Sequence, residues 1–293
     1  MKEITILSGK GGAGKTSVTA AIASFANNAV FCDNDVDAAD LHLIFNPEIE
    51  ESHPFSSGSI ATIDSASCTQ CGLCESSCRF DAIHTNTTGS PEVNPHQCEG
   101  CRLCERICPE KAITTKENFN NEWYVSNTRF GKLVHARMSP GEENSGKLVS
   151  RIREKAREIA TATKADFVVN DGPPGIGCTA ISSITGVNAV LLVIEPTVSG
   201  LHDAKRLIKL VQSFNIKMFA IINKYDIDKV FSNKVEGYLA SQNIDVLYRV
   251  PFDTVMVESM VNQQTLSEFA PDSVISINML ETWQKLSEQL IEN

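Results

Sequence analysis

The sequence predicts a doubly wound α/β fold with a mostly parallel sheet, interrupted by a small α+β insert. Apolar segments of strand length alternate with amphipathic segments of helix length along most of the 293 residues. Two strand segments, residues 189–194 and 218–222, are continuously apolar, which is typical of strands buried on both faces. From about residue 63 to about residue 116 the alternation stops and cysteines accumulate. The predicted domains are therefore a discontinuous α/β domain, residues 1–62 and 117–293, and an insert, residues 63–116.

The individual elements follow from the same periodicity. Strands are expected at residues 1–7, 29–33, 166–171, 189–194, 217–223 and 245–250. Helices are expected at residues 16–26, 147–163, 200–213, 230–241 and 279–291, with a further helix beginning near residue 181. Asn144 and Ser145 offer caps for the second of these helices. Residues 123–128 and 133–137 are expected to form a hairpin that joins the insert back to the α/β domain.

Composition narrows the classes of function. Hydrophobic residues make up 42% of the chain, which argues against a disordered protein. No apolar run approaches the roughly 18 residues of a membrane span, and the chain begins with a strand pattern instead of a signal sequence, so we expect a cytoplasmic protein. In that reducing compartment the ten cysteines suggest metal or redox chemistry. The net charge of −10 makes nucleic acid an unexpected partner, and the acidic C-terminal helix makes a membrane anchor unexpected.

A glycine-rich loop lies between the first expected strand and the first expected helix. Residues 9–16 (GKGGAGKT) match the phosphate-loop pattern G-x4-G-K-[ST] in the context that the pattern requires. Backbone N–H groups of such a loop surround phosphates, Lys15 places a positive charge on the outer phosphates, and the Thr16 hydroxyl is a Mg²⁺ ligand. The residues expected to bind the nucleotide here are Gly11, Gly12, Ala13, Gly14, Lys15, Thr16 and Ser17.

Acidic residues follow two of the expected strands. Asp33 and Asp171 each come at the carboxyl end of a strand, where parallel sheets present their ligand crevice. We expect Asp171 to hold Mg²⁺ and Asp33 to act as a catalytic group toward the attacking water. Asp37 is a further candidate for a catalytic, metal or switch role, whereas Asp35 is expected to be a solvated loop charge.

The cysteine-rich segment contains an internal repeat. The run Cys68–Ile83 recurs 30 residues later as Cys98–Ile113, with eight of sixteen positions identical. Each copy has the spacing C-x2-C-x2-C-x3-C of the bacterial ferredoxin run, in which the fourth cysteine ligates the other cluster. Two such runs predict two [4Fe–4S] clusters, with the ligand sets Cys68, Cys71, Cys74 and Cys108, and Cys98, Cys101, Cys104 and Cys78. Two zinc sites would use the same eight thiolates and are the alternative.

The other two cysteines lie outside the repeat. Cys32 falls inside an expected strand and is interpreted as a small core residue. Cys178 is expected to be a buried small residue at a helix start. The alternatives are a cluster ligand that bridges two subunits and a transient redox or metal contact.

The phosphate loop also carries a family resemblance. Its second lysine, Lys10, is typical of the deviant Walker A motif of the family that includes MinD, ParA and the nitrogenase iron protein, and the resemblance extends to residues 33–37 (DNDVD), 171–177 (DGPPGIG) and 195–200 (EPTVSG). The resemblance implies a dimer that encloses two ATP molecules. It implies that Lys10 reaches the partner's phosphates as a catalytic group, much as an arginine finger does.

The same resemblance assigns further residues. Asp33 and residues 172–177 would lie in two switch segments, and Asn223 and the backbone at Pro251 would contact the adenine. Together with the cysteine repeat, the chain resembles MinD-superfamily ATPases that contain an inserted ferredoxin domain.

These observations lead to one leading hypothesis and two alternatives. The leading hypothesis is a dimeric Mg²⁺-dependent ATPase that couples its nucleotide state to iron–sulfur electron transfer, or to metallocluster assembly, on a partner protein. The dimer would form between two copies of the chain or with a similar ATPase. The alternatives are a ParA- or MinD-like positioning ATPase with structural clusters, and an iron–sulfur scaffold or carrier.

Overall fold

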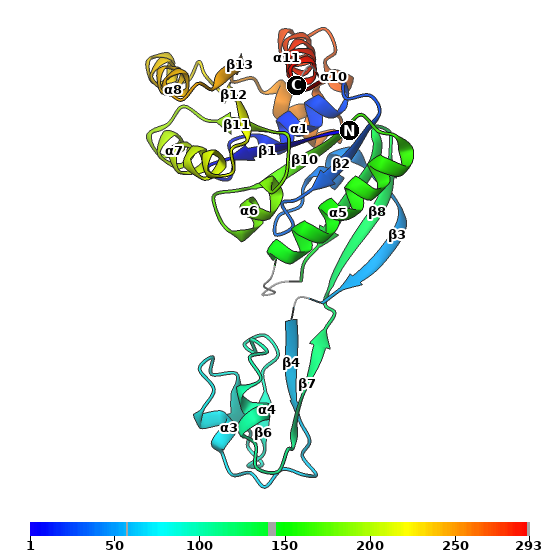
Figure 1. Ribbon diagram of the computed structural model, residues 1–293, viewed down its shortest axis with the longest axis vertical. Coiled ribbons are helices and arrows are strands. Elements are labelled where there is room, and N and C mark those ends of the chain that lie inside the picture. The colour runs from blue at the N-terminus through cyan, green and yellow to red at the C-terminus, as the bar shows by residue number, and fades with distance from the viewer. Residues whose placement is uncertain (57, 140–144, 292–293) are drawn as a thin grey trace. The chain divides into compact units, whose positions relative to one another are not determined.

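A large twisted sheet that contains β1, β10 and β2 is the main feature of the fold (Figure 1). In the computed structural model, which describes residues 1–56, 58–139 and 145–291, this sheet has nine strands in the order β13-β12-β11-β1-β10-β2-β9-β8-β3. Its strands are β1 (Lys2–Ser8), β2 (Ala29–Asp33), β3 (Glu48–Phe55), β8 (Asn121–Thr128), β9 (Gly131–Arg137), β10 (Phe167–Pro174), β11 (Ala189–Ile194), β12 (Lys217–Asn223) and β13 (Asp245–Val250). Neighbouring strands from β13 to β9 pair in parallel, which confirms the predicted α/β fold with a mostly parallel sheet.

Helices cover both faces of this sheet. The helices outside the cysteine-rich segment are α1 (Lys15–Ala23), α2 (Leu41–Phe45), α5 (Ser145–Thr163), α6 (Cys178–Ile184), α7 (Val198–Ser213), α8 (Lys229–Ser241), α9 (Val255–Val261), α10 (Leu266–Phe269) and α11 (Val274–Ile291). Alternate residues of β11 point to opposite faces, because side chains alternate along a strand. Leu191 and Val193 pack in the cluster that contains α1 and α11, whereas Val190 and Leu192 pack in the cluster that contains α7 and α8.

The chain divides into two compact units. The first unit comprises Met1–His53, Trp123–Arg137 and Gly146–Asn293, and the second comprises Pro54–Glu122 and Met138–Ser145. The predicted insert, residues 63–116, lies inside the second unit.

Short elements build the second unit. Two antiparallel pairs, β4 with β7 and β5 with β6, accompany two short helices. Their bounds are β4 (Gly58–Ile63), α3 (Leu73–Ser76), β5 (Ile83–Thr85), β6 (Pro91–Val93), α4 (Leu103–Ile107) and β7 (Ile113–Asn118). The buried core of this unit is small, and cysteine sulfurs are part of it.

Most expected elements are present with ends shifted by a few residues. The expected hairpin of residues 123–128 and 133–137 is present as the neighbouring strands β8 and β9, and β9 also pairs in parallel with β2, so the hairpin extends the sheet. Strand β3 was not expected, because its sequence EIEESHPF carries almost no apolar pattern. The expected cap Asn144 lies outside the described residues. Among the described residues, no helix combines the length and the apolar character that crossing a membrane requires.

Candidate functional site

The phosphate loop lies between β1 and α1, as expected. Gly12 and Gly14 adopt φ values of 77° and 94°, a left-handed conformation that glycine takes without a steric penalty. Gly14 is the N-cap of α1 and no side chain caps this helix. The first N–H groups of α1 are therefore available to an anion, and the helix dipole favours negative charge there.

Lys15 is buried at the start of α1, and its nearest acid is Asp35. The Lys15 Nζ atom lies 3.6 Å from Asp35 Oδ2, and the Asp35 side chain is only 13% exposed. Burial raises the pKa of Asp35 to about 6, although the charge of Lys15 opposes the rise. The expectation that Asp35 is a solvated loop charge is therefore wrong. Asp37, the preferred candidate, is exposed on the same loop.

Thr16 and Asp171 lie together, as a Mg²⁺ site requires. The Thr16 hydroxyl donates to Asp171 Oδ2 at 2.8 Å, and the Thr19 hydroxyl donates to Asp171 Oδ1 at 2.8 Å. Burial raises the pKa of Asp171, whereas Lys15 and the two hydroxyls act in the opposite direction. The phosphate-loop pattern ends before Thr19 and does not predict this contact, but Thr19 lies one helical turn after Thr16 and so shares its face. These oxygen donors match the ligands that Mg²⁺ prefers.

Asp33 is fully buried beside the same site. Its two carboxylate oxygens accept hydrogen bonds from the backbone N–H groups of Asp35 at 3.2 Å and Leu41 at 3.1 Å. Burial raises the pKa of Asp33 well above its usual range, and the negative charge of Asp171 adds to the rise. Asp33 therefore holds the loop that runs from β2 to α2.

Lys10 is paired with an acidic residue of a different loop. Its Nζ atom lies 2.7 Å from Glu195 Oε2 and 3.5 Å from the Thr197 hydroxyl. Lys224 Nζ lies 3.2 Å from the other oxygen of Glu195. The two lysines hold the pKa of Glu195 below its usual range against the opposing effect of burial, with the Lys10 hydrogen bond as the largest contribution. In the sequence Glu195 is only the first residue of the segment 195–200 that carries the family resemblance, and no local pattern indicates that it is the partner of Lys10.

The residues expected at the adenine come from the ends of β12 and β13. Asn223 is buried and its side-chain amide donates to the carbonyl of Ala13 in the phosphate loop at 2.9 Å. Pro251 directly follows β13, and the next residue, Phe252, is exposed. Ser17 is half-buried on the first turn of α1. The structure thus places Asn223 against the loop, and Pro251 at the end of the neighbouring strand.

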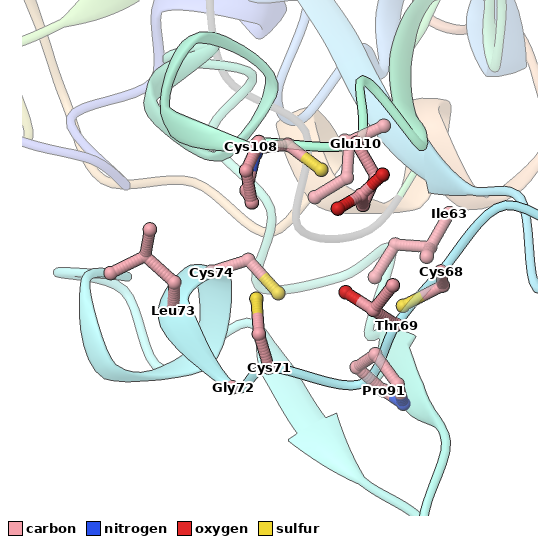
Figure 2. Close-up of a pocket in the computed structure, with 12 residues that line it drawn as sticks. Ile63, Cys68, Thr69, Cys71, Gly72, Leu73, Cys74, Pro91, Cys108 and Glu110 are labelled. Atoms are coloured by element: carbon pink, nitrogen blue, oxygen red, sulfur yellow. The ribbon is translucent and has the colours of Figure 1, made fainter.

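The first predicted cysteine set lines one cavity. Cys68, Cys71, Cys74 and Cys108 surround it together with apolar residues and Glu110. Figure 2 shows the sulfurs of Cys71, Cys74 and Cys108 turned toward the same space, with Cys68 on its far side. Three of these residues come from one copy of the repeat and Cys108 comes from the other.

The second predicted cysteine set lines a second cavity. Its four cysteines are Cys78, Cys98, Cys101 and Cys104, again with the fourth ligand from the opposite copy. Burial raises the pKa of Cys74 in the first cavity and of Cys104 in the second. Within the described residues, no three His, Cys, Asp or Glu side chains are arranged to hold a single metal ion.

The two cysteines outside the repeat behave differently from each other. Cys32 is fully buried in β2, as expected for a core residue, and its thiol lies 3.0 Å from Asn34 Oδ1. Cys178 begins α6 and is exposed, so the expectation of a buried residue is wrong.

Comparisons with known proteins agree with this geometry. The model of the family described as "CobQ/CobB/MinD/ParA nucleotide binding domain" matches residues 4–266. The uncharacterized protein MJ0578 of Methanocaldococcus jannaschii is 32% identical over 292 residues, covering 98% of this chain and 96% of that protein. The uncharacterized protein MJ0579 of the same organism is 25% identical over 146 residues, covering 50% of this chain and 48% of that protein.

Solved structures share the fold at low sequence identity. The septum site-determining protein MinD of Pyrococcus horikoshii, complexed with Mg-ADP, is 18% identical with a TM-score of 0.60, and the match covers 98% of this chain and 96% of that one. MinD in the MinC:MinD cell division complex of Aquifex aeolicus matches with the same values. The Cyanothece McdA(D38A)–ATP complex is 15% identical with a TM-score of 0.58, covering 100% of this chain and 96% of that one.

Proposed function

Because the chain belongs to the CobQ/CobB/MinD/ParA nucleotide-binding family, we propose that it is a Mg²⁺-dependent ATPase whose nucleotide state is coupled to iron–sulfur clusters in its second unit. Lys15 and the backbone from Gly11 to Gly14 would hold the phosphates of ATP. Thr16 and Asp171 would hold Mg²⁺, and they already lie within hydrogen-bond distance of each other.

The observation that carries the iron–sulfur half is the sorting of eight cysteines into two cavities of four. Each cavity takes three cysteines from one copy of the repeat and the fourth from the other copy, which is the exchange that ferredoxin runs use. Four thiolates are a complete donor set for one [4Fe–4S] cluster, so the residues fit the group. When bound, such clusters supply one-electron chemistry at potentials that the surrounding charges tune.

The chain's own residues suggest how hydrolysis would be controlled. Asp33 lies next to Asp171 and would orient the attacking water, with Asp37 as a further catalytic candidate. Lys10 is held by Glu195 within one chain, so it would have to leave this pair to reach the phosphates of a second subunit. Dimerisation would then gate hydrolysis, because the developing phosphate charge needs that cation.

The second subunit would be another copy of the chain or a similar ATPase. The similarity of the chain to two different proteins of one organism supports a partner of the same kind. The process that we expect the ATPase cycle to drive is electron transfer to a redox partner, or metallocluster assembly on it. In the sequence, the cysteine-rich segment leaves the α/β domain between Asp33 and Asp171, and so between the two switch segments.

A positioning ATPase in which the clusters are structural is the second candidate. The observation that favours it is the fold likeness to MinD and to McdA over nearly the whole chain. In that case the clusters would stabilise the second unit and would not respond to nucleotide.

Anaerobic purification with metal analysis and EPR spectroscopy tests the proposal. About eight irons per chain are expected from two four-iron clusters, with reduced-state spectra or midpoint potentials that differ between ATP, ADP and no nucleotide. Protein that carries only zinc, or no metal, would overturn the iron–sulfur half. Eight irons with spectra and potentials indifferent to nucleotide would favour the positioning ATPase.

A further inference from the structure

The two cavities are built on the same backbone geometry. Equivalent positions of the two repeat copies share left-handed φ values, namely Gln70 and Gly100 at 57° and 60°, Gly72 and Arg102 at 71° and 60°, and Asp81 and Lys111 at 48° and 51°. Backbone N–H groups also contact the fourth cysteine of each copy alike, from Ala82 to the Cys78 sulfur at 3.4 Å and from Ala112 to the Cys108 sulfur at 3.3 Å. Differences between the cavities therefore come mainly from their side chains.

Charged side chains distinguish the two linings. The first cavity contains Glu110, whose carboxylate lies between Cys108 and Cys68 in Figure 2. The equivalent residue in the second cavity is Phe80. The second cavity instead contains Glu99 and Arg102, whose opposite charges offset each other. The lining of the first cavity thus carries one more negative charge than that of the second.

Arg102 brings a positive charge to the second cavity at the position where the other copy has Gly72. Both residues hold a left-handed φ, of 60° and 71°, so the backbone is alike and the side chain is what differs. The Arg102 side chain is exposed and has no ion-pair partner in the described part of the chain. An arginine that lines the cavity and has no ion-pair partner among the described residues leaves its positive charge beside the group bound there.

We propose that Arg102 and Glu110 give the two cavities different reduction potentials. The cluster held by Cys98, Cys101, Cys104 and Cys78 is then the more easily reduced of the two. The inference rests on the proposed iron–sulfur function. Reduction adds one electron to a site that is already negative, so a nearby cation favours the reduced state and a nearby carboxylate opposes it.

One contact in the first cavity works against this order. The backbone N–H of Gln70 lies 3.4 Å from the Cys68 sulfur, and a donor to a ligating sulfur raises the potential. The decisive measurement is therefore how each potential moves when the charges are exchanged between the copies.

The exchange uses the residues that the other copy already carries. Arg102→Gly installs the glycine of the first copy and removes the left-handed arginine, so we expect it to fold. Gly72→Arg is its reciprocal. A Cβ at Gly72 would meet no atom within 4 Å, and the φ of 71°, although strained for a side chain, is close to the 60° that Arg102 already holds. Arg106→Ser is the matched control. Arg106 is an exposed arginine on α4, the helix that begins directly after Arg102, and it lines neither cavity. Serine is the residue at the equivalent position of the other copy, Ser76.

The measurement is an anaerobic reductive titration followed by EPR, with an external low-potential donor supplying the electrons. In the unmodified chain we expect two waves, with the first electron favouring one cluster by about tenfold, which is about 59 mV for a one-electron couple. Arg102→Gly lowers the upper wave and merges it with the lower one. Gly72→Arg and Glu110→Gln each raise the lower wave, Arg102→Lys preserves the gap, and Arg106→Ser leaves both waves in place.

Two results would overturn the inference alone. The first is a chain with eight irons whose waves do not move in Arg102→Gly. The second is an equal shift in Arg106→Ser, which would make the effect one of general surface charge. A chain without iron would overturn the proposed function together with this inference.

Discussion

The phosphate-loop region and the cysteine-rich unit differ in what holds their sites in shape. Around the loop, polar groups of the protein form hydrogen bonds with other groups of the protein. Asp171 accepts from two threonine hydroxyls, and Asn223 donates to the carbonyl of Ala13. Large clusters of buried apolar residues lie on both faces of the sheet beneath. The contacts that shape the loop are therefore made between groups of the protein itself.

The cysteine-rich unit has a much smaller buried core. Its core cluster of buried residues consists of Ala61, Cys74, Ile83 and Ile113, and four more cysteines pack against it. Small domains bury too little apolar surface to be stable alone and usually need disulfides or metals. The cysteines predicted to bind the clusters are thus part of the core that the bound clusters would stabilise. One site binds its ligand on a preformed scaffold, whereas the other is expected to depend on its ligand for its fold.

The largest expected effect comes from removing a buried cysteine of the second unit. Cys74→Ala should lose iron from its cavity and cost the unit several kcal/mol, since metal-binding free energy is folding free energy in small metallodomains. Hydrogen exchange in the full chain should show β4, β5 and β7 losing protection while the large sheet keeps it. Cys178→Ser, an exposed cysteine outside both cavities, is the control. Full iron content in Cys74→Ala would remove this contrast between the two regions.

A change in the phosphate loop tests the other side of the comparison. Lys15→Ala removes the buried cation from α1 and should weaken ATP binding by about 100-fold, because hydrogen bonds to charged groups contribute about 1.5–3 kcal/mol each. Iron content and exchange protection of the second unit should not change. Titration calorimetry measures the affinity, and Lys205→Ala, on α7, is the matched control. Iron lost from Lys15→Ala would mean that the two regions are not independent in folding.

The sequence predicted what depends on local pattern. The order of strands and helices follows from periodicity, and the sorting of eight cysteines into two sets follows from the repeat spacing. It missed Asp35 and Glu195, because both become important only when loops from separate strands converge on Lys15 and Lys10. Strand β3 could not be predicted, because it has polar residues on both faces and so shows no alternation of apolar and polar residues.

The smallest expected effect concerns Asp35, which the sequence predicted to be a solvated loop charge. Asp35 has a pKa of about 6 in the folded chain against an ordinary value of 3.8. The folded state therefore holds this proton more tightly than the unfolded state, and stability falls as the pH rises from about 4 to about 6. Asp35→Asn removes the titrating group, so this fall should shrink by on the order of 1 kcal/mol. Asp37→Asn is the control, because Asp37 is exposed. Urea unfolding of the nucleotide-free chain between pH 4 and pH 7 measures both. If the free energy of unfolding depends on pH in the same way in Asp35→Asn, the loop around Lys15 is exposed to water. The contrast between a preformed site and a ligand-dependent site would then be weaker.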